Sequence, residues 1–255
     1  MVWNAEFGGL SHSYSVCPAS NRALSSRLLA YFRPHSGDYY ATCMAAAYIS
    51  YLYRKEMSKK RYIFSDFDGT LTTKDSMMEI IIYQRGKSGL IIALLSILPW
   101  LIMMLLHLYP NQKTKEKLLY HCFGSMTESE FDAFCQRFAD AHKHLLRDNL
   151  YQKLLLAKTE GTEVVVVTAS PENWVSRLAP DFKVLGTKMQ FSKDGFTGHF
   201  LTRNCYGKEK VKRILAAYPE LESLRNDSHI TAYGDSKGDA AMLAFADEKH
   251  FRDFI

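Results

Sequence analysis

Three short runs of apolar residues predict the buried strands of a parallel sheet. The run "YIF" ends shortly before Asp66, "VVVV" ends directly before Thr168, and "ITAY" is followed by Gly234 and Asp235. Four valines without a polar residue between them are typical of a strand covered on both faces. In such sheets ligands bind just beyond the carboxyl ends of the strands, so these polar residues are candidates for one shared site.

A long helical segment separates the first strand from the second. About ninety residues follow Asp68 before the valine run, which is far too many for a bare loop. Residues 76–153 follow helical patterns, and Thr127 with Glu130 forms a capping box at the start of one helix. Four residues then recur at helical spacing and are expected in the core: Phe131, Phe134, Cys135 and Phe138.

The first 56 residues differ in pattern from the rest of the chain. Residues 1–37 show no helical or strand period, and 41–53 form a short apolar helix candidate. The stretch "MSKKRYIF", which starts at Met57, reads like a protein start that runs into the first strand. We therefore expect residues 1–56 to be an extension with little structure; the alternative is a short accessory helix that packs on the core.

Composition and charge are those of an ordinary globular chain of 255 residues, with 47% apolar residues and a net charge of +5. The absence of a dense Lys/Arg stripe argues against a nucleic-acid partner, whereas the mild positive charge suits an anionic substrate or membrane surface. The five cysteines form no C-x-x-C pair, which favours reduced thiols and a cytosolic compartment. The composition does not determine an oligomeric state.

The stretch "FSDFDGTLTTKDS" places two carboxylates at the end of the first strand. A carboxylate can act as a nucleophile and form an aspartyl-phosphate, and Asp66 is the candidate for that role. Asp68, two residues further, would face the same cavity and can carry a proton. The alternative is a loop with two solvated acids, because short motifs of this kind recur by chance.

The second strand leads into a corner that suits a phosphate group. Thr168 offers a hydroxyl, and Ala169 and Ser170 offer backbone N–H groups. Pro171 suits the first turn of a helix, whose positive end would attract the phosphate. Ser170 could also be the N-cap of that helix, and the two roles are compatible.

One lysine is expected to balance the charges of a nucleophilic aspartate and a phosphate group. The stretch "YGKEKVKRIL" predicts a helix with an apolar stripe, and its lysines are Lys208, Lys210 and Lys212. Lys210 is our choice, because it stands directly before the stripe and four residues after Tyr206. The other two lysines are expected at the solvated surface.

The stretch "YGDSKGDAAML" adds two more carboxylates. Asp235 ends the third strand, and Asp239 lies about one helical turn further, so both can face one cavity. Mg²⁺ takes a few carboxylate oxygens together with a substrate phosphate oxygen and waters. Asp66, Asp235 and the backbone carbonyl of Asp68 could supply the protein ligands.

In this order, from residue 60 to about 250, the motifs resemble those of the haloacid dehalogenase (HAD) superfamily of phosphatases. The resemblance implies an α/β fold, in which residues 57–75 and 154–255 form a doubly wound parallel sheet with its helices and 76–153 form an inserted helical cap. It also implies Mg²⁺ as the cofactor. The roles that it implies are a nucleophile at Asp66, an acid and base at Asp68, a phosphate-binding hydroxyl at Thr168, a charge-balancing Lys210, and a metal site of Asp66, Asp68 and Asp235 supported by Asp239.

Finer features resemble the phosphoserine-phosphatase-like subfamily IB and, within it, the phosphatidylglycerophosphatase C-type branch, on the stretches "TASPENW" and "GKEKVKRI". Asp68 argues against dehalogenation, because dehalogenases lack the second aspartate. Ser236 and Gly238 depart from the Gly-Asp-Gly-x-Asn-Asp pattern of phosphoserine phosphatases, which weakens a phosphoserine assignment. Asp75 is a candidate substrate contact, since those enzymes have a carboxylate at this place, and its alternative role is the N-cap of a helix.

An apolar run lies within the predicted cap. Residues 90–109, "LIIALLSILPWLIMMLLHLY", contain no Asp, Glu, Lys or Arg and are long enough as a helix to span a bilayer. A single crossing would separate Asp66 from the later site residues, so the run must be a hairpin bent near Pro99, a helix pair in the membrane interface, or helices buried in the cap. Positive charge on both sides favours two cytoplasmic ends, and three lysines are expected to meet anionic lipid: Lys113, Lys115 and Lys117.

We therefore expect an Mg²⁺-dependent phosphomonoester hydrolase that works through an aspartyl-phosphate at the cytoplasmic, inner face of a membrane. Its expected substrate is a membrane lipid phosphate, such as phosphatidylglycerophosphate. A soluble phosphatase for phosphoserine or another small metabolite is the alternative. A catalytically silent membrane-binding protein is a third possibility, which the complete set of carboxylates and the lysine disfavour.

Overall fold

The computed structural model describes Tyr48 and residues 59–223 and 225–254. The predictions for residues 1–56 therefore lie, apart from Tyr48, outside the described residues. Lys59–Ile255 form one compact unit, and the fold and the site described below belong to it.

A five-stranded sheet forms the centre of this unit, with the strand order β3-β2-β1-β6-β7. All neighbouring strands run parallel, which confirms the predicted parallel sheet. The three predicted apolar runs become the central strands, while the edge strands β3 and β7 were not predicted from the sequence. The strands are β1 (Lys60–Ser65), β2 (Glu163–Pro171), β3 (Lys183–Thr187), β6 (Ser228–Gly234) and β7 (Glu248–Phe251).

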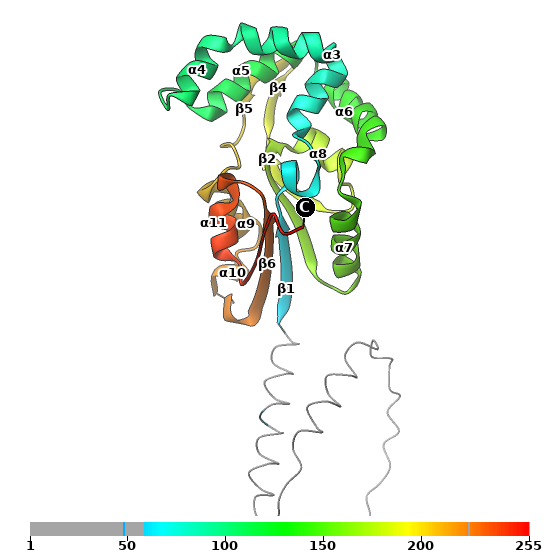
Figure 1. Ribbon diagram of the computed structural model, residues 1–255, viewed down its shortest axis with the longest axis vertical. Coiled ribbons are helices and arrows are strands. Elements are labelled where there is room, and N and C mark those ends of the chain that lie inside the picture. Colours follow the sequence, from blue (N-terminus) through cyan, green and yellow to red (C-terminus); the bar gives the residue numbers. More distant parts are fainter. Residues whose placement is uncertain (1–47, 49–58, 224, 255) are drawn as a thin grey trace, which may run out of the picture. The chain divides into compact units, whose positions relative to one another are not determined.

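Helices cover both faces of the sheet, and the valines of β2 explain why. Val164 and Val166 join the apolar cluster on one face, while Val165 and Val167 join the cluster on the other. Figure 1 shows α7 and α8 on one side of the sheet and α9, α10 and α11 on the other. These helices are α7 (Asp148–Thr159), α8 (Glu172–Leu178), α9 (Lys208–Ala217), α10 (Glu220–Ser223) and α11 (Ala240–Phe245). The sheet is therefore doubly wound, as predicted.

A cap of helices and one hairpin lies over the carboxyl ends of the strands (Figure 1). Its helices are α3 (Ser76–Ser96), α4 (Leu98–Leu105), α5 (Asn111–Phe123) and α6 (Glu128–His142), followed by the short turn η2 (Lys143–Leu145). The capping box of Thr127 and Glu130 is present at the start of α6. The antiparallel hairpin of β4 (Met189–Ser192) and β5 (Gly195–Phe200) packs on α5, although it comes from a later part of the chain that was not assigned to the cap.

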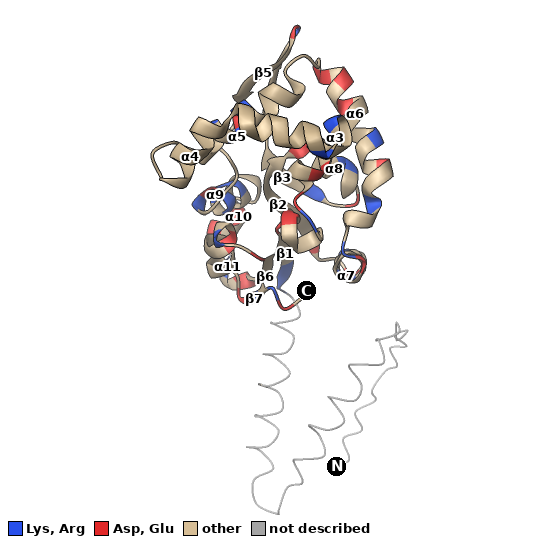
Figure 2. Ribbon diagram, turned by 45° about the horizontal axis from the view of Figure 1, so that its top comes forward, with Lys and Arg blue, Asp and Glu red and all other residues tan. Residues whose placement is uncertain are grey.

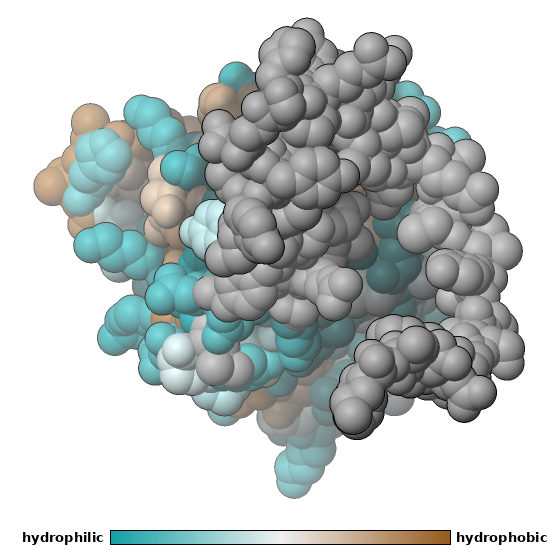
Figure 3. Space-filling model, turned by 90° about the horizontal axis from the view of Figure 1, so that it is seen from below, coloured by the Kyte–Doolittle hydropathy of each residue, from teal (hydrophilic) through white to brown (hydrophobic). Residues whose placement is uncertain are grey.

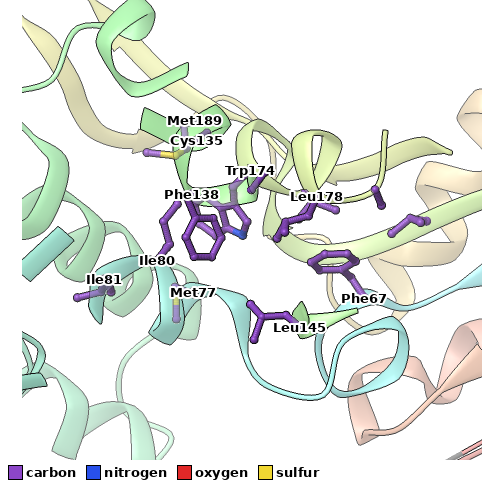
Figure 4. Packing of buried hydrophobic residues seen from close by; sticks show 14 of the residues in the cluster. Phe67, Met77, Ile80, Ile81, Cys135, Phe138, Leu145, Trp174, Leu178 and Met189 are labelled. Atoms are coloured by element: carbon purple, nitrogen blue, oxygen red, sulfur yellow. The ribbon is translucent and has the colours of Figure 1, made fainter. Parts of the chain in front are cut away.

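The cap and the sheet share one apolar cluster at their junction (Figure 4). Trp174 of α8 is fully buried there, together with Phe138 of α6 and Phe67 at the end of β1. The indole Nε1–H of Trp174 donates a hydrogen bond to Ser76 Oγ at 2.9 Å, which links α8 directly to the first residue of the cap. Because a buried aromatic side chain of this size contributes several kcal/mol, this junction holds the cap in place over the strand ends.

The apolar run of residues 90–109 does not form one straight helix. α3 is kinked at Gly86, where φ is 71°, and it meets α4 at an angle of 68° next to Pro99. Among the described helices, none is by itself long and apolar enough to cross a membrane, whereas the bent pair α3–α4 passes on length and composition together. Ala93 and Ile97 are buried, but nine large apolar residues are exposed. The alternative that the run is buried inside the cap is therefore wrong.

Candidate active site

One cavity of about 390 Å³ lies between the carboxyl ends of the strands and the cap. Core and cap both contribute to its lining, and the short helical turns η1 (Phe67–Leu71) and η4 (Lys237–Asp239) follow β1 and β6 at its floor. All of the site residues predicted from the sequence line this cavity: Asp66, Asp68, Asp75, Thr168, Ala169, Ser170, Lys210, Asp235 and Asp239.

A buried lysine connects three strand ends. The Lys210 ammonium donates to Asp66 Oδ1 at 2.5 Å, to the Val167 carbonyl at 2.7 Å and to Asp239 Oδ1 at 2.6 Å. All three N–H groups of the ammonium are thus engaged, which holds the side chain in one position. Lys208 and Lys212, on the same helix α9, are exposed. Of the three candidate lysines, only the chosen one reaches the cavity.

The charges in this group shift one another's pKa values. Burial raises the pKa of the Asp66 carboxyl to about 7, and the Asp239 charge acts in the same direction while the Lys210 ammonium opposes it. Burial also disfavours the charge on Lys210, but the two carboxylates outweigh this effect and raise the pKa of the ammonium. Asp66 therefore lies in an environment that keeps its carboxylate poorly solvated.

Asp68 is held by two donors from different segments. Its Oδ1 accepts a hydrogen bond from the Ser76 backbone N–H at 2.7 Å, and its Oδ2 accepts one from Ser170 Oγ at 2.5 Å. Burial raises the pKa of the Asp68 carboxyl, as does the Asp75 charge, and the two serine donors oppose that shift. Ser170 does not cap α8, since Pro171 occupies the N-cap without a side-chain hydrogen bond.

Two further predicted residues have local hydrogen bonds. The buried hydroxyl oxygen of Thr168 accepts from the Ser170 N–H at 3.0 Å, which shapes the corner between β2 and α8. Asp75 is the N-cap of α3, where its carboxylate accepts from the Met78 N–H at 3.0 Å. Asp75 also lines the cavity, so its capping role and its role as a candidate substrate contact are compatible.

The carboxylates at the floor of the cavity fit a small divalent cation. Oxygens of Asp66, Asp235 and Asp239 lie within 4.8 Å of one another. Both carboxylate oxygens of Asp239 accept hydrogen bonds, one from Lys210 and the other from the backbone N–H groups of Asp235 and Ser236. The carboxylate of Asp235, by contrast, accepts no hydrogen bond from the described residues. This leaves Asp66 and Asp235 as the better ligands and Asp239 as their support.

Gly69 makes this arrangement possible. Its φ of +77° lies in the region that favours glycine, and a Cβ atom here would lie 2.5 Å from Asp235 Oδ2. The turn after Asp68 can therefore approach the Asp235 carboxylate closely enough for both segments to contribute ligands to one ion.

Comparison with known proteins agrees with this geometry. The chain matches the haloacid dehalogenase-like hydrolase family over residues 63–244, which is more than half of its length. It is also 33% identical over 200 residues to protein CicA of Caulobacter vibrioides, covering 74% of this chain and 84% of that protein. The chain belongs to the haloacid dehalogenase-like hydrolase family. It is therefore an enzyme, a HAD-type hydrolase.

Solved structures share the fold of this HAD-type hydrolase at low sequence identity. A protein of unknown function from Bordetella pertussis Tohama I matches with a TM-score of 0.64 at 16% identity, over 75% of this chain and 89% of that one. A substrate-bound phosphoserine phosphatase matches with a TM-score of 0.51 at 14% identity, over 75% and 85% of the two chains. At these identities the likeness extends to the fold alone.

The cap of the HAD-type hydrolase adds two polar residues to the cavity that the sequence analysis missed. Asn111 and Lys115, both on α5, line the cavity. Burial lowers the pKa of the Lys115 ammonium, and the charges of Asp68 and Asp75 oppose this. The expectation that Lys115 meets anionic lipid is thus corrected, because its side chain turns toward the site. The four-residue spacing of Asn111 and Lys115 is the only signal in the sequence that pairs them.

Other contributions come from residues to which the sequence analysis gave no role in the site. Thr70 Oγ1 donates to Asp66 Oδ2 at 3.3 Å, so the threonine of the first motif helps to orient the candidate nucleophile. Tyr206 lines the cavity above Gly238, where a Cβ atom would lie 2.5 Å from the tyrosine ring. The glycine that departs from the phosphoserine phosphatase pattern is therefore needed for the close approach of this ring.

Proposed function

We propose that this hydrolase is an Mg²⁺-dependent phosphomonoesterase that works through an aspartyl-phosphate on Asp66. The observation that carries the proposal is the buried contact of Lys210 with Asp66 and Asp239, next to the free carboxylate of Asp235. A lysine in this position neutralises a nucleophilic carboxylate and the charge of an incoming phosphoryl group. The experiment is Mg²⁺-dependent release of phosphate from an aryl phosphate, which Asp66→Asn should abolish.

In the first step an oxygen of Asp66 attacks phosphorus, and the bond between phosphorus and the leaving alcohol breaks. Asp68 gives its proton to that alcohol, and its raised pKa suits a proton donor. In the second step Asp68 takes a proton from a water molecule, which attacks the aspartyl-phosphate and restores Asp66. The Ser76 N–H and the Ser170 hydroxyl hold the Asp68 carboxyl during both steps.

The phosphoryl group would occupy the corner beyond β2. The Thr168 hydroxyl and the backbone N–H of Ala169 are the candidate donors to its oxygens, whereas the predicted donor Ser170 N–H is already engaged by Thr168 Oγ1. Asp66, Asp235 and the Asp68 carbonyl would hold Mg²⁺, with Asp239 in support, and the bound ion would supply positive charge opposite the equatorial oxygens.

We further propose that the substrate is a phosphomonoester on a membrane lipid and that the enzyme works at the inner face of the membrane. The support is an exposed apolar cap surface on α3, α4 and the turn after α4, where Leu105 is 68% exposed and Leu108 is 73% exposed. Monomeric proteins rarely expose such a large apolar area unless it is an interaction site. The apolar cap surface consists of Ile91, Ile92, Leu95, Leu98, Ile102, Met103, Leu105, Leu106 and Leu108.

Charge favours a lipid surface over a second protein. Residues 80–115 contain no Asp or Glu but include three cations that do not line the cavity: Arg85, Lys87 and Lys113. Figure 2 shows α4 without any charged residue, and Figure 3 shows hydrophobic residues at the left edge, the side on which α4 projects in Figure 1. An apolar surface next to cations suits an anionic bilayer, where each cation near the surface contributes about 1 kcal/mol.

The apolar cap surface also lies close to the site along the chain. Only five residues separate Leu105 at the end of α4 from Asn111, which lines the catalytic cavity. A cap that rests on one leaflet would therefore hold the cavity near the level of the lipid headgroups. A phosphomonoester headgroup could then enter while its acyl chains stay in the bilayer.

The test replaces four exposed residues of the apolar cap surface with Ser: Ile91, Leu95, Ile102 and Leu105. The control variant carries Leu156→Ser and Leu201→Ser, two exposed apolar residues elsewhere on the molecule. The cap variant should leave liposomes in a flotation assay and lose hydrolysis of a bilayer-embedded phosphomonoester, while it keeps hydrolysis of an aryl phosphate. Unchanged activity on both substrates would point to a small soluble metabolite instead.

A further inference from the structure

Lys115 is a part of the cavity that the proposed reaction does not use. It lies on α5 of the cap, and its side chain lines the same cavity as Asp66 and Asp68. Asn111 lies one helical turn earlier on α5 and also lines the cavity. The two residues therefore present one polar face of the cap helix to the space above the nucleophile.

Lys115 is partly buried and has no hydrogen bond or ion pair with any residue that the structure describes. The neighbouring lysines of α5 do have partners. Lys113 pairs with Glu116 at 2.7 Å, and the Lys117 ammonium lies over the ring of Trp100 at 4.5 Å. Removing an ammonium group from water is costly when no anion contacts it, so a ligand that places a negative charge in contact with Lys115 would bind here favourably.

The other cations that line the cavity are already engaged. Lys210 donates all of its N–H groups to Asp66, Asp239 and a backbone carbonyl. Lys74 pairs with Glu79 at 3.0 Å. Among the described residues that line the cavity, Lys115 is thus the cation that remains for a group of the substrate beyond the transferred phosphoryl group.

We propose that Lys115 and Asn111 form an anion subsite, which binds a second negatively charged group a few bonds away from the phosphomonoester. This inference rests on the proposed phosphatase function and narrows its substrate class. Because the subsite belongs to the cap, it faces the leaving-group part of the substrate, where a phosphodiester or a carboxylate would supply the charge. A lipid headgroup can carry the phosphodiester, and a small metabolite can carry the carboxylate.

Two matched pairs of substrates test this subsite and separate the two sources. The lipid pair is dihexanoyl phosphatidylglycerophosphate, which has a phosphodiester beside its phosphomonoester, and dihexanoyl phosphatidic acid, which lacks the second anion. The soluble pair is 3-phosphoglycerate, with its carboxylate, and glycerol 3-phosphate, without it. The values of kcat/KM are measured for wild type, Lys115→Gln and Lys115→Arg, with Lys113→Gln on the same helix as the control.

Lys115→Gln should lower kcat/KM about tenfold to a hundredfold for the doubly anionic member of a pair, as expected for the loss of one charge-assisted hydrogen bond. For the member that lacks the second anion, kcat/KM should fall less than about threefold. Lys115→Arg should keep part of the preference, and Lys113→Gln should keep all of it. A preference in the lipid pair alone identifies a phosphodiester, and one in the soluble pair alone identifies a carboxylate.

Equal losses on both members of each pair would overturn the subsite, because Lys115 would then act on the transferred phosphoryl group. A wild-type enzyme that prefers neither doubly anionic substrate would also overturn it, while normal turnover would leave the phosphatase function intact. If the wild type hydrolyses none of the four compounds or the aryl phosphate, the proposed function fails, and the subsite fails with it.

Discussion

Replacing Asp66 with Asn should abolish phosphatase activity and at the same time stabilise the metal-free protein at neutral and higher pH. Asp66 is 7% exposed, and burial raises the pKa of its carboxyl from 3.8 to about 7 in the folded chain. The folded chain therefore keeps a proton on Asp66 up to about pH 7, whereas the unfolded chain loses it near pH 4. The stability of the wild type should accordingly fall as the pH rises from about 4 to 7.

The size of this effect follows from the two pKa values. At about 1.36 kcal/mol for each tenfold change in the protonation equilibrium, ionised Asp66 costs the folded protein about 4 kcal/mol at pH 8. At pH 5 the cost is about 2 kcal/mol, because the folded chain keeps its proton on Asp66 while the unfolded chain has largely lost it. Asn is close in shape to the protonated carboxyl and carries no charge, so the variant should avoid this cost at both pH values.

The assay is urea unfolding with EDTA present, at pH 5 and pH 8, for wild type, Asp66→Asn and the control Glu222→Gln, which changes an exposed carboxylate away from the cavity. The advantage of Asp66→Asn over the wild type should grow by about 2–3 kcal/mol between the two pH values. The control should show no such trend. A variant that is less stable than the wild type at pH 8 would refute the reasoning, since the Lys210 contact would then outweigh the burial of the charge.

Three further predictions concern the same cavity. Lys210→Met should abolish activity and lower the free energy of unfolding by about 3–5 kcal/mol, because Asp66 and Asp239 lose their shared cation. In urea unfolding, the controls Lys208→Met and Lys212→Met should stay within about 0.5 kcal/mol of the wild type. Asp68→Asn should slow turnover about 10²- to 10⁴-fold with an alkyl phosphate. The loss should be smaller with a nitrophenyl phosphate, because its leaving group needs no proton. Equal losses with the two substrates in steady-state assays would count against an acid role for Asp68. Added Mg²⁺ should raise Tm more at pH 8 than at pH 5.5 in differential scanning calorimetry, because Asp66 must lose its proton before it can bind a cation, and an equal rise at both pH values would argue against Asp66 as a ligand.

The strand ends were predictable from the sequence because their signals are local. An apolar run followed at once by a polar residue predicts both a buried strand and a side chain at its carboxyl end, as for Thr168 and Asp235. The choice of Lys210 also depended on nearby residues, since the apolar stripe of α9 determines which lysine faces the sheet. Such signals need no knowledge of distant contacts.

The cap residues were not predictable in the same way. Lys115 resembles its neighbours Lys113 and Lys117 in sequence, and only the docking of α5 over the strand ends separates their surroundings. The hairpin β4–β5 joins the cap from a part of the chain about seventy residues after α5, so its place depends on tertiary contacts rather than on local pattern. The kink of α3 at Gly86 likewise leaves no signal in the helical periodicity of the sequence.

The most direct test of the account is chemical capture of the intermediate. The enzyme is mixed with Mg²⁺ and an excess of aryl phosphate, quenched with acid and reduced with borohydride, which converts an aspartyl-phosphate into homoserine. Mass spectrometry of the peptides should then find homoserine at position 66 in the wild type and none in Asp66→Asn or in samples with EDTA. Phosphate release without any captured residue at position 66, or capture at Asp68 instead, would contradict the assignment of Asp66 as the nucleophile.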